Sequence, residues 1–301
     1  MHDEAPQAGG PVTVAAQLRD AMPELTPSER KVARALLAAY PVAGLGTLAE
    51  LARHADVSGP TVLRLLTRLG FAGFTDFQRR LLMEIDERSA TAAEHFDPER
   101  GGTAESLVRM TLLTVTADLA ADVESITETE VRDVVEALAE ARRVFLIGGA
   151  LSHAAAYYLY LQLDMLRPGC RFLGAAGAPA WNALLELGRR DVLVVFDYRR
   201  YEPVTLEITR YAAAKSVRVV LFTDRWLSPV AGEAGHLLVS RTASPSAFDT
   251  LVPAIAYAET IAAALAVRLG SKVQRRIAAG EAVQRGRSWE RPDGGDTSPP
   301  S

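Results

Sequence analysis

The stretch LAELARHADVSGPTVLRLL, residues 48–66, decides the N-terminal part of the fold. It predicts two short helices that meet at a tight angle, which is a helix-turn-helix. Such a pair needs a small residue where the helices touch, and Ala52 provides it. It also needs an apolar residue in the turn, Val57, and a residue that caps the second helix, Ser58. The stretch therefore predicts a module that binds DNA.

The start of the second helix of such a module faces the base edges in the major groove. Arg64 lies one turn along this helix and is the candidate base reader, because arginine can bond guanine O6 and N7 together. We expect phosphate contacts from Arg68 and from two arginines beyond the helix. The expected DNA-contacting residues are Ser58, Gly59, Thr61, Arg64, Arg68, Arg79 and Arg80. The alternative is a plain three-helix bundle whose arginines form a solvated face.

The distribution of charge supports the DNA-binding interpretation. The whole chain has a formal net charge of −4. Residues 26–80, however, contain eight basic and four acidic residues, so this segment is positive and the rest of the chain is strongly negative. A basic module on an acidic body is typical of a DNA-binding domain joined to another function.

Composition excludes several classes of protein. The chain has 301 residues, enough for two domains, and 49% of them are hydrophobic. Its single cysteine, Cys170, excludes an internal disulfide, and its five histidines lack the spacing of a metal site. No apolar run reaches the roughly 18 residues that span a bilayer, and the first twenty residues do not resemble a signal peptide. We expect a cytoplasmic protein without a metal, a cofactor or a membrane span.

The domain organisation follows from breaks in composition. Residues 1–12 and 286–301 are expected to be disordered, because glycine, proline and polar residues dominate them. The helix-turn-helix domain is expected at 13–88, followed by a linker at 89–102. The second domain is then expected to cover 103–285.

The second domain shows a regular alternation of helices and strands. Two amphipathic helices, at about 103–125 and 128–141, precede short apolar runs, and a long helix at about 249–269 follows them. The predicted strands are 144–147, 171–173, 192–196, 217–222 and, more weakly, 237–239. Apolar strands that alternate with helices predict a parallel sheet with helices on both faces.

The first domain resembles the N-terminal domain of RpiR/MurR-type transcription regulators. The resemblance rests on LTPSERKVA at 25–33, LAELA at 48–52, DVS at 56–58 and RLGFAGFTDFQ at 68–78. In that family the second half is a sugar isomerase (SIS) domain. The resemblance implies an α-helical helix-turn-helix domain followed by an α/β SIS domain, which has a flavodoxin-like parallel sheet with helices on both faces.

The loop after the first predicted strand is the first candidate ligand site. Ligands of open parallel sheets bind beyond the carboxyl ends of the strands, and a helix N-terminus there attracts anions. Similar SIS domains have Gly-x-Gly-x-Ser at this point; this chain keeps Gly148 and Ser152 but has Ala150 at the second glycine. A strand-to-helix turn that needs a flexible backbone is the alternative. The loop lacks the GxGxxG pattern of a dinucleotide-binding fold.

The loop after the third predicted strand departs from the family. Similar SIS domains have Ser-x-Ser-Gly-x-Thr there, whereas this chain has Asp197, Arg199 and Glu202 at the three hydroxyl positions. Arg199 and Arg200 would suit a carboxylate or a phosphate held by charge. The alternative is that they form local salt bridges with the two acids. Ser246, before the last helix, is either a ligand residue or a helix cap.

Two classes of function remain at this point. The preferred one is a regulator that binds a double-stranded, palindromic operator as a homodimer or homotetramer and senses a small anionic metabolite, either a carboxylate or a sugar phosphate. An isomerase would need a general base, for which only His153, Glu186 and Glu202 lie near the predicted strand ends, and none is in a recognisable motif. The DNA-binding domain therefore favours sensing, with no catalytic residues. An SIS half that only dimerises is a further alternative.

Overall fold

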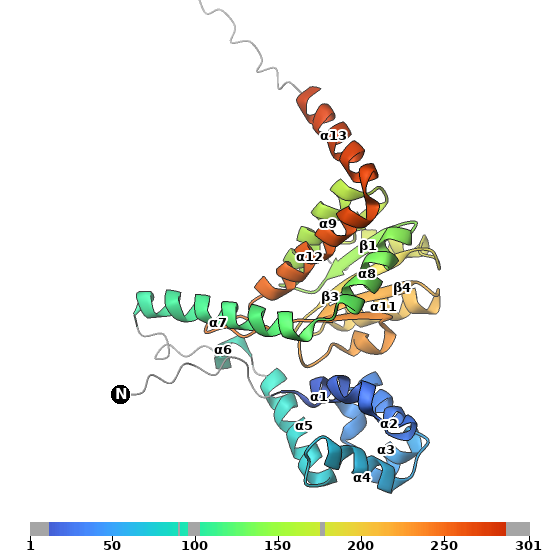
Figure 1. Cartoon of the computed structure of the whole chain (residues 1–301), viewed down its shortest axis with the longest axis vertical. Helices are drawn as coiled ribbons and strands as arrows, with labels where there is room; N and C mark the ends of the chain where they lie inside the picture. Colours follow the sequence, from blue (N-terminus) through green and yellow to red (C-terminus); the bar gives the residue numbers. More distant parts are fainter. Residues whose placement is uncertain (1–11, 90, 96–102, 175–177, 287–301) are drawn as a thin grey trace, which may run out of the picture.

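The chain folds into two units, a helical domain and an α/β domain, seen one below the other in Figure 1. The computed structural model describes residues 12–89, 91–95, 103–174 and 178–286. The expected disordered ends therefore lie almost wholly outside the described residues, as does most of the expected linker.

The helical domain is built from five α-helices around one hydrophobic core. They are α1 (Val14–Ala21), α2 (Pro27–Ala38), α3 (Leu48–His54), α4 (Gly59–Arg68) and α5 (Phe74–Ser89). Capping boxes begin α2 at Thr26 and α3 at Thr47, where each threonine hydroxyl accepts from the third backbone amide of its helix. The helix-turn-helix predicted from the sequence is α3 with α4, and Ala52 is buried in the core.

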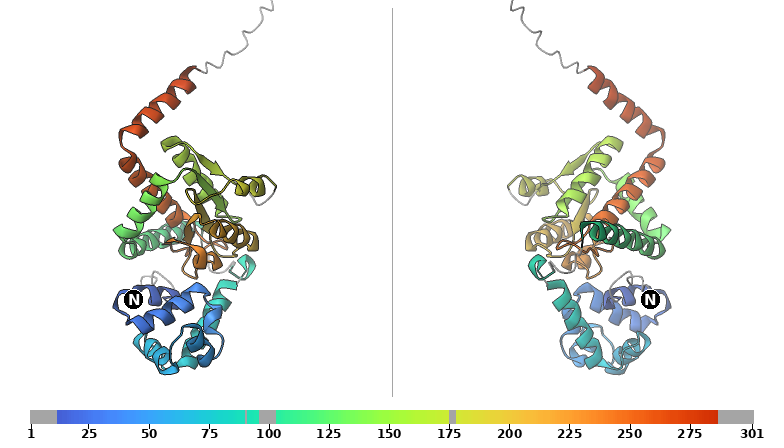
Figure 2. Two further views of the ribbon diagram at one scale, coloured as in Figure 1. Left: turned by 90° about the vertical axis from the view of Figure 1, so that its right-hand side faces the viewer. Right: turned by 90° about the vertical axis from the view of Figure 1, so that its left-hand side faces the viewer.

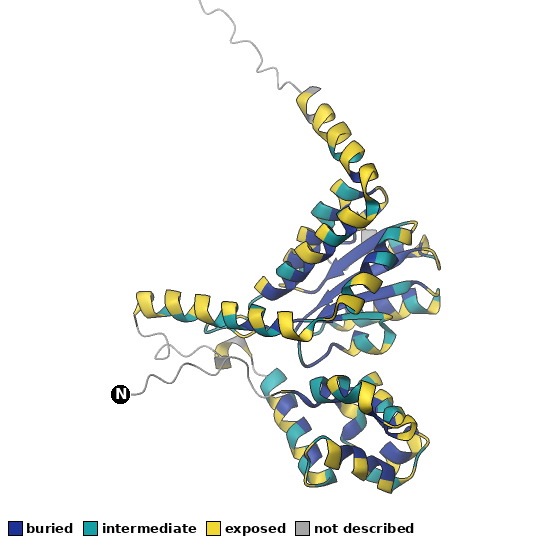
Figure 3. Ribbon diagram, viewed as in Figure 1, coloured by how far each residue is buried: buried dark blue, intermediate teal, exposed yellow. Residues whose placement is uncertain are grey.

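Three helices lead into the α/β domain. They are the short α6 (Ala92–His95), the long α7 (Ala104–Ser125) and α8 (Glu128–Glu140). Helix α7 projects sideways from the body of the protein, and the burial colours show most of its length exposed (Figures 1 and 3). Its bounds agree with those predicted from the sequence.

A five-stranded parallel sheet forms the centre of the α/β domain. The strands are β1 (Val144–Gly148), β2 (Cys170–Phe172), β3 (Val192–Asp197), β4 (Arg218–Thr223) and β5 (His236–Val239), in the order β2-β1-β3-β4-β5. The remaining helices are α9 (His153–Leu166), α10 (Ala178–Leu185), α11 (Pro203–Ala214), α12 (Val252–Leu269) and α13 (Ser271–Gly286). This strand order is that of a flavodoxin-like sheet, as expected.

Alternate residues of each strand face opposite cores, as strand geometry requires. Val194 and Phe196 of β3 pack with α8, α9 and α12, whereas Leu193 and Val195 pack with α10 and α11. Helix α12 is long and apolar enough to cross a membrane by composition, but Ile261 and Leu265 on one side of it are buried in the first of these cores. The core helix of a protein that does not cross a membrane can have the same length and apolar composition.

The two domains touch along one side of the sheet, and Figure 2 shows the helical domain directly beneath the α/β domain. Leu227, in the loop after β4, is buried in the hydrophobic core of the helical domain. Polar contacts flank it: Arg225 pairs with Glu87 of α5, and its carbonyl accepts from the Thr13 hydroxyl at 3.0 Å. Arg19 of α1 also pairs with Glu130 of α8 at 3.2 Å.

Candidate functional site

The outward face of α4 is the candidate DNA interface. Side chains on the opposite face, such as Val62 and Leu65, are fully buried, so the orientation of the helix is set by the core. The exposed positions along it are Pro60, Leu63, Arg64, Thr67 and Arg68. Arg64, the expected base reader, is therefore presented to solvent. Its Nη2 donates to Thr61 Oγ1 at 3.1 Å, which holds the guanidinium close to the start of the helix.

The structure corrects the expected role of Thr61. Its side chain is buried because it lies on the core face of α4, next to Val62. Its hydroxyl lies 3.0 Å from that of Ser58, the residue that precedes the helix. Thr61 therefore organises the start of the recognition helix from inside, whereas Ser58 remains exposed. Gly59 is partly exposed between them.

The three arginines expected at phosphates differ in their surroundings. Arg68 pairs with the buried Glu29 at 3.7 Å, and Arg80 pairs with the buried Glu84 at 3.4 Å, so both hold the domain together. Arg80 is only 22% exposed, which argues against a phosphate contact. Arg79 is 68% exposed, with only the neighbouring Asp76 as an ion-pair partner among the described residues.

The expected ligand loops meet at the point where strand order reverses. The loops after β1 and β3 border a small cavity of about 70 Å³, together with residues from before α12. Because β1 has β2 on one side and β3 on the other, this is the topological switch point, where ligands of such sheets bind. Four of the six expected ligand residues line this cavity, namely Ser152, Asp197, Arg199 and Arg200, whereas Gly148 and Ser246 do not.

Two of the expected ligand residues have structural roles here. Gly148 ends β1, and a Cβ atom on it would lie 2.7 Å from the backbone of His153, so the close turn requires glycine. Ser152 is buried, and its hydroxyl donates to the carbonyl of Phe196 at 2.7 Å, joining the loops after β1 and β3.

Glu202 holds the loop after β1 from across the cavity. Its Oε1 accepts a hydrogen bond from the backbone amide of Ala150 at 3.1 Å. This amide precedes α9, and amides at such a position favour anions. A carboxylate of the protein itself therefore occupies one anion-binding group of the switch-point cavity.

Arg199 and Arg200 point to different surroundings. Arg199 pairs with Asp249 at 2.9 Å, a partner that sequence reasoning missed, and its guanidinium lies 4.4 Å from the ring centre of Trp226. Arg200 is exposed and has φ 70°, a left-handed conformation uncommon for a residue with a side chain. Such strain is concentrated at ligand clamps and switch regions.

Two buried carboxylates lie next to the loop that carries these arginines: Asp197 at the end of β3 and Asp224 after β4. Burial raises the pKa of Asp197 to about 7, although a hydrogen bond from the Ser228 hydroxyl opposes the shift. Burial also raises the pKa of Asp224 to about 6, despite the hydroxyl of Tyr201 and the amides of Arg199 and Trp226 that donate to it. Asp224 thus ties the loop after β3 to the loop after β4.

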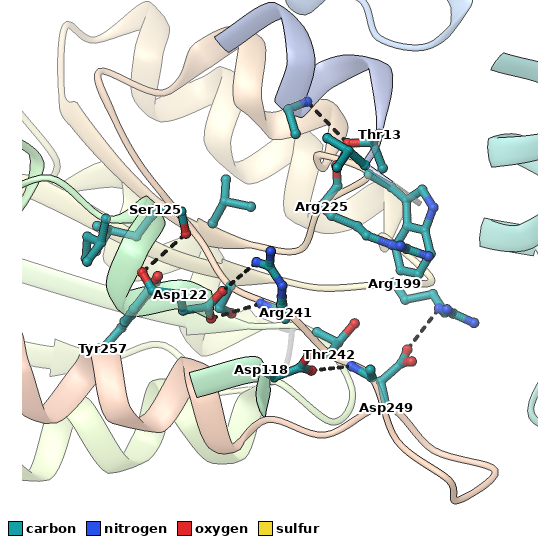
Figure 4. Close-up of a pocket in the computed structure, with 18 of the residues that line it drawn as sticks. Thr13, Asp118, Asp122, Ser125, Arg199, Arg225, Arg241, Thr242, Asp249 and Tyr257 are labelled. Atoms are coloured by element: carbon teal, nitrogen blue, oxygen red, sulfur yellow. Dashed lines mark hydrogen bonds and ion pairs between the residues drawn. The ribbon is translucent and has the colours of Figure 1, made fainter. Parts of the chain in front are cut away.

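Ser246 caps no helix. Its hydroxyl accepts from the amide of Phe248 at 3.1 Å in a local turn, and α12 begins only at Val252. It lines a second, larger cavity of about 370 Å³, which lies between the two domains (Figure 4). Sequence reasoning missed this cavity because its walls come from α1, α5, α7, α8, β5, α12 and several loops, far apart in the chain.

The residues considered as an isomerase base are dispersed. Glu186 pairs with Arg143 at 2.6 Å, just before the amino end of β1, so it lies at the wrong edge of the sheet. The His153 ring packs edge-on against Phe172 at 4.7 Å. Of the three, only Glu202 lines the switch-point cavity. Among the described residues, no group of histidine, cysteine and acidic side chains is arranged to hold a metal ion.

A DNA-binding helix-turn-helix docked on a sugar-isomerase-type sheet defines a class of transcription regulators. Residues 12–88 match the family model of the rpiR-family helix-turn-helix domain, and residues 137–266 match that of the SIS domain. The chain belongs to the RpiR family of transcription regulators.

Relatives of known sequence match about 70% of this chain. An uncharacterized HTH-type transcriptional regulator of Haemophilus influenzae is 26% identical over 72% of this chain and 75% of its own length. The bifunctional protein glk of Burkholderia orbicola is 28% identical over 69% of this chain, but the match spans only 32% of that protein.

Solved structures share the fold. The sugar isomerase domain of an RpiR transcription factor from Sphaerobacter thermophilus has a TM-score of 0.56 and 24% identity, covering 58% of this chain and 98% of that one. The Vibrio vulnificus NanR protein, complexed with ManNAc-6P, has a TM-score of 0.53 and 18% identity, covering 90% of this chain and 98% of that one.

Proposed function

We propose that this regulator binds a palindromic operator as a symmetric oligomer and that an anionic metabolite bound at the switch-point cavity controls it. The observation that carries the proposal is the meeting of the loops after β1 and β3 at the switch point, with Arg199 and Arg200 beside an amide that already holds a carboxylate. In this proposal the metabolite and the operator are both met in the cytoplasm.

The chemistry of the cavity supports a small anion. The Ala150 amide holds the carboxylate of Glu202, so an anionic effector that displaced Glu202 would find the same donor. A carboxylate is as suitable as a phosphate, because the hydroxyl loop of related domains is missing. With Glu202 in place, about 70 Å³ is too small for a sugar phosphate, so binding such a ligand requires Glu202 to move. The ManNAc-6P complex of NanR supports the phosphate alternative.

Exposed apolar side chains support the oligomer. On α7, Val108 and Leu112 are mostly exposed, and α9 presents Tyr157, Leu161 and Met165 to solvent. Large exposed apolar residues gathered on helix faces are typical of interfaces between subunits. Closed two-fold symmetry would place two copies of α4 on the two halves of a palindrome.

DNA binding is tested by replacing Arg64. The Arg64→Ala variant is expected to lose about 1–3 kcal/mol of binding free energy and to relax base preference at one position of each half-site. The measurement is a mobility-shift titration with the DNA upstream of the protein's own gene and with substituted versions of it. Arg132→Ala, an exposed arginine on α8, is the matched control and should bind like the wild type. Unchanged binding by Arg64→Ala would mean that another face of the domain contacts DNA.

The effector site is tested through Glu202. The Glu202→Gln variant removes the competing carboxylate, so anions should bind it more tightly than the wild type. Thermal shifts with N-acetylmannosamine 6-phosphate, glucose 6-phosphate, citrate and lactate measure this, since a bound ligand stabilises the folded state. Arg200→Ala should abolish the shift. If none of these anions shifts the wild type or the Gln variant, the cavity does not sense them, and the SIS domain would serve only for dimerisation.

A further inference from the structure

The larger cavity lies between the DNA-binding domain and the SIS domain and has the dimensions of a ligand site. Its volume of about 370 Å³ falls within the range of small-molecule pockets. Helix α1 contributes Ala16 and Arg19 together with its N-cap Thr13, while α7 contributes Asp118 and Asp122. Figure 4 shows Thr13 with Arg225 and Asp118 with Asp122 around the same space.

The charges that line this cavity do not balance. Six acidic residues and four arginines line it: Asp20, Glu87, Asp118, Asp122, Glu130 and Asp249, with Arg19, Arg199, Arg225 and Arg241. Each arginine is paired with one of these acids, in the pairs Arg19–Glu130, Arg199–Asp249, Arg225–Glu87 and Arg241–Asp122. Within the described part of the chain, no arginine or lysine lies at ion-pair distance from Asp118. The cavity therefore has an excess of negative charge.

Asp118 is an unusual residue to bury. Of the residues of α7 whose burial is described, Asp118 and Asp122 are the only ones classed as buried, although the helix carries several leucines and valines. Asp118 is 1% exposed, and its Oδ2 accepts from the amide of Ala243 at 3.0 Å. One backbone hydrogen bond is a weak compensation for removing a carboxylate from water. Burial accordingly raises the pKa of Asp118, and that of Asp122 to about 6.

A second polar group at this cavity lacks a partner. Trp226 lines it and is 3% exposed, and its indole N–H has no hydrogen-bond acceptor among the described residues. A buried donor without an acceptor lowers the stability of the folded state, and a bound molecule that accepts its hydrogen bond removes this penalty. The cavity thus combines a carboxylate that needs a cation with a donor that needs an acceptor.

We propose that this interdomain cavity is a second effector site, which takes a small hydrophilic molecule with a protonated amino group held by Asp118 and with a hydroxyl or carboxylate oxygen near Trp226. The site is distinct from the switch-point cavity and prefers the opposite charge. It shares Arg199 and Asp249 with that cavity, which brings the two sites into contact.

Such a ligand would act on the placement of the DNA-binding domain. Thr13, Ala16 and Arg19 belong to that domain, whereas Asp118 and Trp226 belong to the other. A molecule that touches both domains binds best when they are docked as in this structure, so it favours this arrangement by its binding free energy. The amine ligand would therefore regulate DNA binding through the docking of the two domains.

The test uses the full-length protein and matched pairs of probes, in which only one member carries a protonated amine. Glucosamine is compared with N-acetylglucosamine, and lysine with Nε,Nα-diacetyl-lysine, each at millimolar concentration by thermal shift and then by calorimetry. We expect a free amine to stabilise the wild type and its acetylated partner to have no effect. Asp118→Asn keeps an oxygen for the Ala243 amide and should weaken the amine by about tenfold or more.

A second variant tests the location. Ala16→Phe fills the cavity from the side of α1 and should abolish the amine response while leaving the shifts caused by anions at the switch point intact. Asp133→Asn, an exposed acid on α8, is the control and should respond like the wild type. The proposal is overturned if no free amine shifts the wild type, or if the response survives in both Asp118→Asn and Ala16→Phe. The anion tests with Glu202→Gln are independent of either result.

Discussion

The hydroxyl of Ser228 donates a hydrogen bond to Oδ2 of Asp197. Asp197 ends β3 and lines the switch-point cavity, while Leu227, next to Ser228 in the chain, is buried in the core of the helix-turn-helix domain. The switch-point cavity and the helix-turn-helix domain are therefore separated by one hydrogen bond and one peptide unit. A ligand that moves the end of β3 has a direct route to the position of the DNA-binding domain.

Leu227 is expected to hold the two domains together. It is 2% exposed, and a Leu→Ala change in a core costs about 2–5 kcal/mol. Because the lost contact lies between domains, we expect the wild type to unfold in one transition and Leu227→Ala in two, with the helical domain melting first. Scanning calorimetry measures this. Leu185→Ala, an exposed leucine on α10, should melt like the wild type. A single, unshifted transition in Leu227→Ala would show that the domains do not depend on this contact.

Asp197 is expected to make stability depend on pH. Its pKa is raised by burial to about 7, above the value near 4 of an unfolded aspartate. Between these values the folded state holds more protons than the unfolded state, so raising the pH destabilises the fold, by at most about 1.4 kcal/mol per pH unit. Above pH 7 this contribution is constant.

The comparison of wild type with Asp197→Asn isolates this group. The variant cannot ionise, so its stability should fall less steeply than that of the wild type between pH 5 and 7. Urea unfolding at a series of pH values measures both slopes. Equal slopes in the two proteins would show that Asp197 is ionised throughout this range in the folded state.

Most of the fold could be predicted from the sequence because its signals are local. The apolar runs placed β3 and β4 within one residue of their bounds, and the turn chemistry around Val57 and Ser58 placed the helix-turn-helix. Local patterns do not show which face of a helix meets its neighbours. Thr61 was expected at the DNA for its small size, but the core of the domain turns it inward.

The candidate site was predicted only in part because its contacts are long-range. The loops after β1 and β3 meet as expected for a parallel sheet, which brought Ser152 and Asp197 together. The ion pair of Arg199 with Asp249 joins residues 50 positions apart, and no spacing rule indicates it. The interdomain cavity depends on how the two domains dock, and the sequence around Asp118 has no pattern that indicates this docking.

Arg79 and Arg80 are adjacent in the sequence but should differ in DNA binding. Arg79 is largely exposed, so it is free to meet a phosphate, whereas Arg80 is held by Glu84 and by the carbonyl of Val12. Arg79→Ala should reduce the slope of log affinity against log salt by about 1, and the effect should not depend on DNA sequence. Arg80→Ala should leave that slope unchanged and lower the melting temperature instead. The reverse pattern would place the DNA on the other side of α5.

Gly148 provides a final test of whether a residue of the ligand loop serves the ligand or the turn. A Cβ atom at this position would lie 2.7 Å from both the amide nitrogen and the Cα of His153, and 2.8 Å from the carbonyl carbon of Ser152. All three are backbone atoms, so a side-chain rotation cannot relieve the contact. Gly148→Ala should therefore destabilise the protein by about 1–3 kcal/mol.

Gly188 is the matched control for this substitution. A Cβ atom on Gly188 would meet nothing within 4 Å, so Gly188→Ala should leave stability unchanged or raise it by up to about 1 kcal/mol. Urea unfolding of the two variants gives the difference directly. If Gly148→Ala is as stable as Gly188→Ala but loses its response to anions, then the glycine serves the approach of a ligand. A loss of stability instead shows that the glycine is needed because the chain turns so closely from β1 into α9.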